Sequence, residues 1–228
     1  MRTKSLLPLF LISVMSPASM LWGQNTYVPD DNFEQALIDL GYDDTLDDYV
    51  LTANISGVTS LDVNNKEISD LTGIEDFTSL TSLVCSYNEL TSLDISSNTA
   101  LTHLQCHVNE LVSLDVSTNT ALTFLKCRNN QLATLDVIAN TSLITLECST
   151  NQLTGLDVSN NTALTHLHCS SNQFTSLDVS NNTALNQLTC GNSPLTSLDL
   201  SNNTSLNSIN REWTVAVKQW HQGCILLC

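Results

Sequence analysis

The chain has 228 residues, of which 42% are apolar and 5% aromatic, and it carries 23 acidic against 7 basic residues. This length and apolar content are enough for one large domain with a real core. The formal charge of −16 repels phosphate backbones and anionic lipids, so the composition argues against nucleic acid partners and against membrane association.

Residues 1–23 differ from the rest of the chain. Arg2 and Lys4 precede an apolar run from Leu6 to Met15, and small residues follow, which is typical of a secretory signal peptide. The run is too short to span a bilayer. We expect residues 1–23 to be a signal peptide and the protein to be secreted or located at the cell surface. Removal of this segment takes two basic residues with it and leaves a formal charge of −18.

Residues 24–57 predict a small helical N-terminal cap. In the stretch YVPDDNFEQALIDLGYDD, Pro29 and Asp30 can start a helix and Gly41 can end it. The apolar residues between them share one face of the helix, which is the face that packs on a core. These residues are Phe33, Ala36, Leu37 and Leu40.

Residues 58–210 are built from a repeat. One 22-residue unit that starts at Val58 is followed by six 21-residue units without insertions and by a partial one, and each 21-residue unit reads LxxLxCxxNxLxxLDVSxNTA with minor changes. Such constant periodicity predicts a stacked solenoid. The leucines that set the period are Leu80, Leu101, Leu122, Leu143, Leu164, Leu185 and Leu206.

Each unit is itself double. The half LxxLxCxxN, as in Leu80 to Asn88, is echoed ten residues later by LxxLxIxxN, as in Leu90 to Asn98. Both halves show the alternation of a short strand followed by a corner. We therefore predict two parallel sheets, the first from the LxC halves and the second from the LDV halves. The asparagines at the corners are expected to bond backbone groups that no strand partner reaches.

Six of the eight cysteines follow the 21-residue step. Cys85 occupies the slot that Ile95 fills in the second half of its own unit, so the cysteines are expected to be buried free thiols that act as small hydrophobic residues. Neighbouring in-register side chains lie about 4.8 Å apart and parallel, which suits neither the approach nor the dihedral angle of a disulfide. The periodic cysteines are Cys85, Cys106, Cys127, Cys148, Cys169 and Cys190.

Residues 211–228 match no repeat. They form either a short C-terminal cap or the start of a truncated tail. Cys224 and Cys228 in this segment form a disulfide, a redox pair or two packed thiols, and the sequence does not distinguish these.

Residues 27 to 210, taken together, resemble the secreted, internalin-like leucine-rich repeat proteins of bacteria, in the class with nested 21-residue units. The resemblance rests on the repeat, on the cap stretch quoted above and on the lead-in LDDYVLTANISGVTSLDV. It implies a leucine-rich repeat solenoid, mainly β, with two parallel sheets per stack and a small helical N-terminal cap. Proteins of this family are usually binding modules, so the resemblance also implies a binding function.

Recognition in a solenoid uses outward positions of a sheet, and here the two halves differ. The second half presents the same Ser and Asp residues in turn after turn, whereas the first half varies. We call the outward positions of the first half the variable face and those of the second half the acidic face. The predicted binding residues on the variable face are His103, Gln105, His107, Phe124, Lys126, Arg128, Glu147, His166 and His168.

Other chemistries have weaker support. His166, His168 and Glu147 are a conceivable metal cluster, but a flat sheet holds such ligands apart, and weak calcium binding at the aspartates lacks an EF-hand pattern. No nucleophile elbow, zincin helix or phosphate loop is present. We expect a monomeric, non-enzymatic extracellular module without cofactor that binds a protein or glycan through the variable face. The alternatives are a cation-dependent surface or lattice-binding solenoid that uses the acidic face, and a hydrolase or metal-dependent enzyme.

Overall fold

The computed structural model describes residues 24–210 and 225–227. The predicted signal peptide and nearly all of the C-terminal segment, including Cys224 and Cys228, lie outside these residues. In the described ranges no helix is long and apolar enough to cross a membrane.

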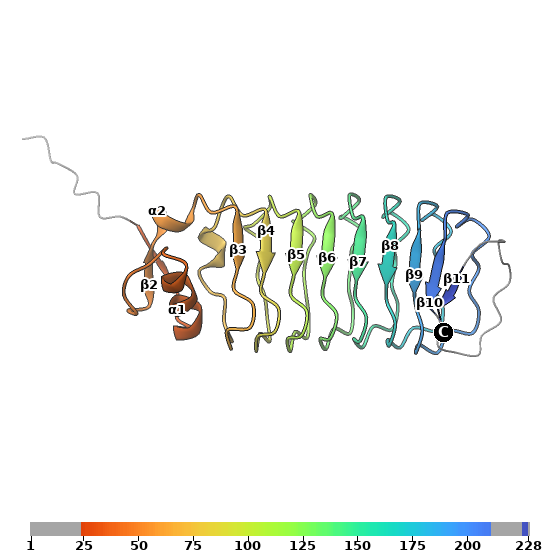
Figure 1. Cartoon of the computed structure of the whole chain (residues 1–228), viewed down its shortest axis with the longest axis horizontal. Coiled ribbons are helices and arrows are strands. Elements are labelled where there is room, and N and C mark those ends of the chain that lie inside the picture. The colour runs from red at the N-terminus through yellow and green to blue at the C-terminus, as the bar shows by residue number, and fades with distance from the viewer. Residues whose placement is uncertain (1–23, 211–224, 228) are drawn as a thin grey trace, which may run out of the picture.

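The N-terminal end consists of two short helices and a small antiparallel sheet (Figure 1). Strands β1 (Asn25–Tyr27) and β2 (Tyr49–Leu51) pair with each other, and helices α1 (Asp31–Asp39) and α2 (Thr52–Ile55) follow them in the chain. The predicted helix is α1, and Phe33, Ala36 and Leu37 of its predicted apolar face are buried. Leu40 was wrongly assigned to this face: it follows the last helical residue and is 46% exposed. Asp30 caps it by accepting hydrogen bonds from the backbone N–H groups of Asn32 and Phe33 at 3.0 and 2.9 Å, and Gly41 follows its end with a φ of +80°.

The other oxygen of Asp30 joins the cap to the repeats. Its Oδ2 accepts hydrogen bonds from the backbone N–H groups of Ser69 and Asp70 at 2.8 and 3.0 Å. Phe33 on the inner side of α1 packs near Phe77, with ring centroids 6.4 Å apart, and both are fully buried. The helix therefore closes the first end of the solenoid core.

One parallel sheet of nine short strands runs along the rest of the molecule (Figure 1). Seven of the strands follow the repeat period, and their central residues pair leucine with leucine or isoleucine from turn to turn. A single 3-10 turn, Ile74–Asp76, lies between the first two strands. The strands are β3 (Ser60–Asp62), β4 (Ser82–Val84), β5 (His103–Gln105), β6 (Phe124–Lys126), β7 (Thr145–Glu147), β8 (His166–His168), β9 (Gln187–Thr189), β10 (Ser208–Asn210) and β11 (Ile225–Leu227).

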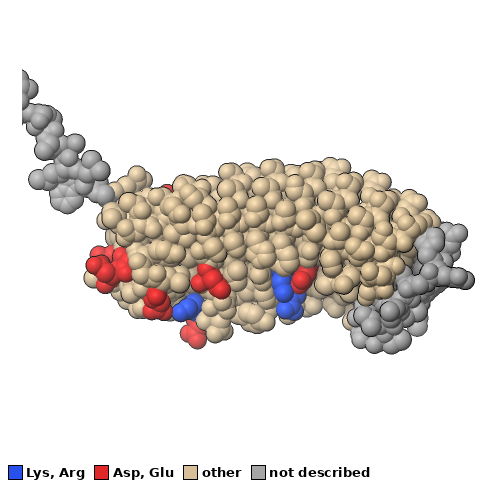
Figure 2. All heavy atoms as spheres, turned by 45° about the horizontal axis from the view of Figure 1, so that its top comes forward, with Lys and Arg blue, Asp and Glu red and all other residues tan. Residues whose placement is uncertain are grey.

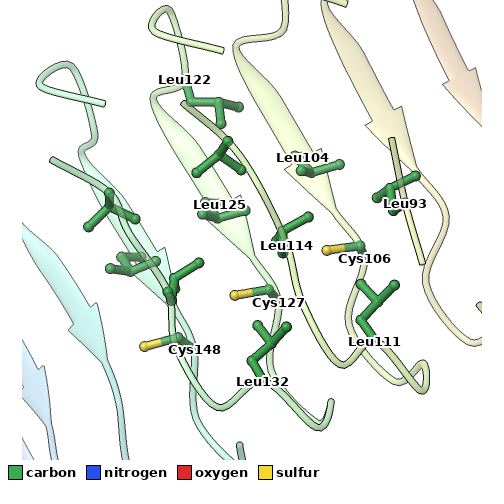
Figure 3. Packing of buried hydrophobic residues seen from close by; sticks show 14 of the residues in the cluster. Leu93, Leu104, Cys106, Leu111, Leu114, Leu122, Leu125, Cys127, Leu132 and Cys148 are labelled. Atoms are coloured by element: carbon green, nitrogen blue, oxygen red, sulfur yellow. The ribbon is translucent and has the colours of Figure 1, made fainter. Parts of the chain in front are cut away.

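The core is the stack of inward side chains from all turns. Figure 3 shows Leu104 and Leu125 beside a row of Cys106, Cys127 and Cys148, with leucines of the opposite half facing them. All six periodic cysteines are fully buried free thiols, as predicted. Burial raises the pKa of Cys85 and Cys148 to about 12, because desolvation penalises the thiolate.

The predicted second parallel sheet is wrong: in the described residues the LDV segments form no extended ladder. The inward residues are still buried, as at Leu93 and Ile95, but the backbone groups have other partners. Asp94 accepts a hydrogen bond from the backbone N–H of Ser96 at 2.9 Å, and the Ile95 carbonyl accepts bonds from the side chain of Asn119 and the backbone N–H of Asn98. These local bonds compete with strand pairing.

The asparagine rows do what the sequence predicts. Asn130, in the first row, donates from Nδ2 to the carbonyls of Cys106 and Cys127 at 3.1 and 3.0 Å, and its Oδ1 accepts from the backbone N–H of Leu111. Asn140, in the second row, donates to the carbonyls of Val116 and Asn119 at 2.9 Å each. Each amide therefore joins its own turn to the preceding one.

Candidate functional site

The variable face is formed by the outward residues of β4 to β9 and of the turns after them. In each of these strands the central leucine is buried and the two flanking residues are half-buried. Parallel pairing without offset places each outward residue beside its equivalent in the next turn. Side chains that are 21 residues apart in the sequence are therefore direct neighbours on this face.

Two rings stack on this face where β5 meets β6. The rings of His103 and Phe124 are nearly parallel, at 12°, with centroids 4.3 Å apart. Gln105, on the same strand as His103, places its Nε2 2.8 Å from Nε2 of that histidine. Burial lowers the pKa of His103. The pair is an ordered platform that presents aromatic surface at the start of the two strands.

Beside the ring stack, two cations converge on one carboxylate. Lys126 on β6 is paired with Glu147 on β7, and Nζ lies 3.3 Å from Oε2. Nε of Arg128 lies 3.8 Å from the same oxygen. The side chains of Lys126 and Glu147 are only 20% and 18% exposed, so this cluster is partly shielded from water.

The sequence predicted that His107 points outward, and this prediction is wrong: the side chain is buried next to the cluster. It is 6% exposed, its Nδ1 lies 2.6 Å from Oγ of Ser86, and the ring of Tyr87 meets it edge-on with centroids 5.1 Å apart. Burial first, and then the charges of Lys126 and Arg128, lower the pKa of His107 to about 4. His107 is therefore neutral at physiological pH and supports the face from beneath.

Tyr87 is a residue of this region that sequence reasoning missed. It is 50% exposed and belongs to the turn after β4, so it adds a third accessible ring to those of His103 and Phe124. Its position in the repeat could have indicated it. The residue before each corner position of the first half varies from turn to turn, as the variable face does.

His166 and His168 extend the face on β8. His168 is paired in register with Glu147, and its pKa is lowered by burial although Glu147 acts in the opposite direction. His166 places Nδ1 2.8 Å from Oγ1 of Thr165. Across residues 24–210 and 225–227, no group of three His, Cys, Asp or Glu side chains is placed to hold a metal ion.

The acidic face is organised differently. Hydrogen bonds from Ser96 and Ser117 hold the pKa of Asp94 and Asp115 below the ordinary value, so these carboxylates are structural acceptors in their own turns. Two shallow hollows of about 360 and 390 Å³ lie on this side, the first between Asp70 and Ser97 and the second between Ser176 and Asn202. The second is lined by the repeated Ser, Asp and Leu residues and the first by such residues together with Thr72, Ile74 and Glu75, and neither contains the rings and cations of the variable face.

Comparison with known proteins places the chain among leucine-rich repeat proteins. A family model described as the leucine-rich repeat domain of the endo-beta-N-acetylglucosaminidase EndoS matches residues 53–161. Internalin J of Listeria monocytogenes is 44% identical over 74 residues, which are 32% of this chain and 8% of that protein. The chain thus matches a small part of the length of this relative.

Two solved structures show the same architecture. Internalin C2 of Listeria monocytogenes superposes with a TM-score of 0.60 at 19% identity and covers 82% of this chain and 97% of its own. The leucine-rich effector YopM of Yersinia pestis gives a TM-score of 0.57 at 28% identity, over 67% of this chain and 42% of its own.

The nine-stranded parallel sheet, the asparagine corners and the uninterrupted 21-residue period define a leucine-rich repeat solenoid. With the capping helix at its N-terminal end and the match to Internalin J, the chain is similar to the bacterial, internalin-like leucine-rich repeat proteins.

Proposed function

We propose that this chain is a non-enzymatic extracellular binding module that recognises a protein partner through the variable face. The observation that carries the proposal is the gathering of rings and cations on β5 to β7, where His103 and Phe124 stack beside Lys126 and Arg128. Aromatic residues and arginine supply most of the energy of protein interfaces, and they are ordered here before any partner arrives.

The shape of the face supports a protein partner. Small ligands need a concave pocket, and the hollows described above lie on the acidic face, away from these residues. A protein interface buries about 800 Å² on each partner and needs no deep cavity. The half-buried side chains of β4 to β9 form a surface of this kind.

The acidic face supports its alternative function less well. Each of its aspartates, from Asp94 to Asp199, accepts a backbone N–H two residues further on at 2.9 Å. This uniform bond is a structural reason for the same aspartate to recur from turn to turn. A cation or lattice ligand is not needed to account for the row.

The test compares variants of the two faces. Candidate partners are collected by cross-linking the chain without residues 1–23 to surface proteins of co-cultured cells, with a glycan array in parallel, and affinities are then measured by calorimetry. Replacing Phe124 and Arg128 by Ala is expected to weaken binding by about 2 kcal/mol or more, with the melting temperature nearly unchanged. The control variant carries Ser113→Ala and Asp115→Asn on the acidic face and is expected to bind normally.

The opposite pattern refutes the proposal. If the acidic-face variant loses binding and the Phe124 and Arg128 variant does not, the site is on the acidic face. Binding only to glycans on the array, with no protein partner that responds to Phe124→Ala, also contradicts a protein-binding function.

A further inference from the structure

The basic residues of the variable face stand out in a strongly acidic protein. The formal charge is −16, and the basic residues within the described ranges are Lys66, Lys126 and Arg128. Lys66 pairs with Asp39 near the cap, with Nζ 3.1 Å from Oδ2. In Figure 2 basic atoms accordingly gather at two places along the visible face, each beside acidic atoms. The variable face holds the place with two cations.

The two cations exceed the one carboxylate that they contact. Lys126 and Arg128 both approach Oε2 of Glu147, at 3.3 and 3.8 Å, so the cluster has a net charge of +1. The field that it creates is visible at His107, where the cations lower the pKa more than Glu147 raises it. The cations therefore outweigh the carboxylate on the His107 side of the cluster, whereas at His168 Glu147 acts on the pKa more strongly than Lys126 does.

Arg128 also has unused hydrogen-bonding capacity. Its contact with Glu147 is made by Nε, and no hydrogen bond or ion pair of its two Nη groups is found with the described residues. A guanidinium group binds a carboxylate best through two parallel N–H bonds, and a side-on contact at 3.8 Å does not provide this geometry. The side chain is 37% exposed, so an incoming carboxylate can reach it.

We infer that the partner presents an acidic peptide segment, that its carboxylate binds Arg128 and Lys126, and that Glu147 is the internal carboxylate with which it competes for these cations. An apolar side chain next to the acidic residue packs on the ring of Phe124, which lies on the same strand as Lys126. This inference rests on the proposed function, because it names the kind of segment that the variable face takes.

The role of Glu147 gives the inference a definite sign. If the partner is acidic, Glu147 repels the incoming carboxylate and occupies its binding groups, so neutralising Glu147 strengthens binding. If the partner is basic, Glu147 is the group that attracts it, and the same change weakens binding. Like charges in a partly shielded site interact more strongly than on an open surface, so the effect is large enough to measure.

The probe is a displayed library of random linear peptides selected against the chain without residues 1–23. We expect the selected peptides to carry Asp or Glu next to an apolar residue. Glu147→Gln is expected to raise their affinity by about tenfold, and Arg128→Gln is expected to lower it by about tenfold. Asp157→Asn is the matched control, because it removes one negative charge from the acidic face and Asn can still accept the backbone N–H of Ser159; it is expected to leave the affinity within about twofold.

Several results would overturn the inference. Basic selected peptides, or weaker binding by Glu147→Gln, would show that the partner is cationic. Binding of anionic glycans but of no acidic peptide would assign the cations to a carbohydrate. Failure of the proposed function gives a different result. The affinity of the selected peptides would then be unchanged by both Phe124→Ala and Arg128→Gln, which would show that they bind to another surface.

Discussion

Val108 offers a direct test of the backbone geometry at the corners of the solenoid. It occupies the slot before the corner asparagine and has a φ of 55°, and its equivalents in the other turns have nearly the same value. The left-handed conformation costs an ordinary residue about 1–2 kcal/mol, and Asn tolerates it best after Gly. Two turns already carry Asn in this slot, as Asn129 and Asn192.

We expect Val108→Asn to stabilise the protein by about 1 kcal/mol. The change relieves the backbone strain but also loses the packing energy of a half-buried valine. For a chain of this size the melting temperature then rises by about 2–4 °C. The reciprocal change, Asn129→Val, introduces the strain one turn further on and is expected to lower stability by a similar amount. Both are measured by urea denaturation and by calorimetry.

The pair of variants separates backbone strain from side-chain packing. Asn129 is exposed, so its replacement by valine disturbs few contacts, and the destabilisation measures the conformational cost alone. The reasoning fails if Val108→Asn destabilises the protein, or if Asn129→Val leaves the denaturation midpoint unchanged.

Two further predictions concern the core. The thiol pKa values of Cys85 and Cys148 are raised from 9.0 to about 12 in the folded chain, so these thiols ionise at lower pH when the chain is unfolded. The free energy of unfolding is therefore expected to fall as the pH rises from 9.0 toward 12. A flat stability profile over this range, or fast reaction of the native chain with a thiol reagent, would contradict this prediction. Asn140→Ala removes two buried amide hydrogen bonds of 2.9 Å and is expected to lower the free energy of unfolding by about 2 kcal/mol or more in chemical denaturation. The control Asn160→Ala loses one exposed bond of 3.4 Å and is expected to lower it by about 0.5 kcal/mol or less. Equal losses would show that the buried row of asparagines adds no stability.

The core of the solenoid could be predicted from the sequence because its period is constant. A 21-residue step without insertions leaves one register, and this register places Leu83 and Cys85 inward, as well as their equivalents in the later turns up to Leu188 and Cys190. The helix after Asp30 could be predicted for a similar reason, since its cap residue, apolar face and terminating Gly41 all indicate the same bounds.

The second sheet was predicted wrongly because alternation alone does not specify hydrogen bonding. The segment LDV alternates just as the segment LxC does, but its outward residue is Asp in turn after turn, and Asp bonds nearby backbone N–H groups more readily than it joins a strand. This bond forms at Asp94 and at each equivalent position. The repetition of Asp was the signal that favoured turns over strands.

At the candidate site, the sequence gives neighbours but not side-chain geometry. The 21-residue step is enough to place Lys126 beside Glu147. The stacking of His103 on Phe124 and the burial of His107 beneath Tyr87 depend on side-chain rotamers and on the preceding turn, which periodicity does not specify. That these residues bind a partner stays a prediction.

The order of the strands in the sheet has a consequence for how the molecule opens. Each turn touches only the turns before and after it, so the array unravels from its ends like a one-dimensional chain of coupled units. The ring stack and ion cluster lie on and beside β5 to β7, with β3 and β4 on one side and β8 to β11 on the other. Fraying at either end must pass through whole turns before it reaches them. The interior position thus insulates the proposed binding residues from the ends of the array.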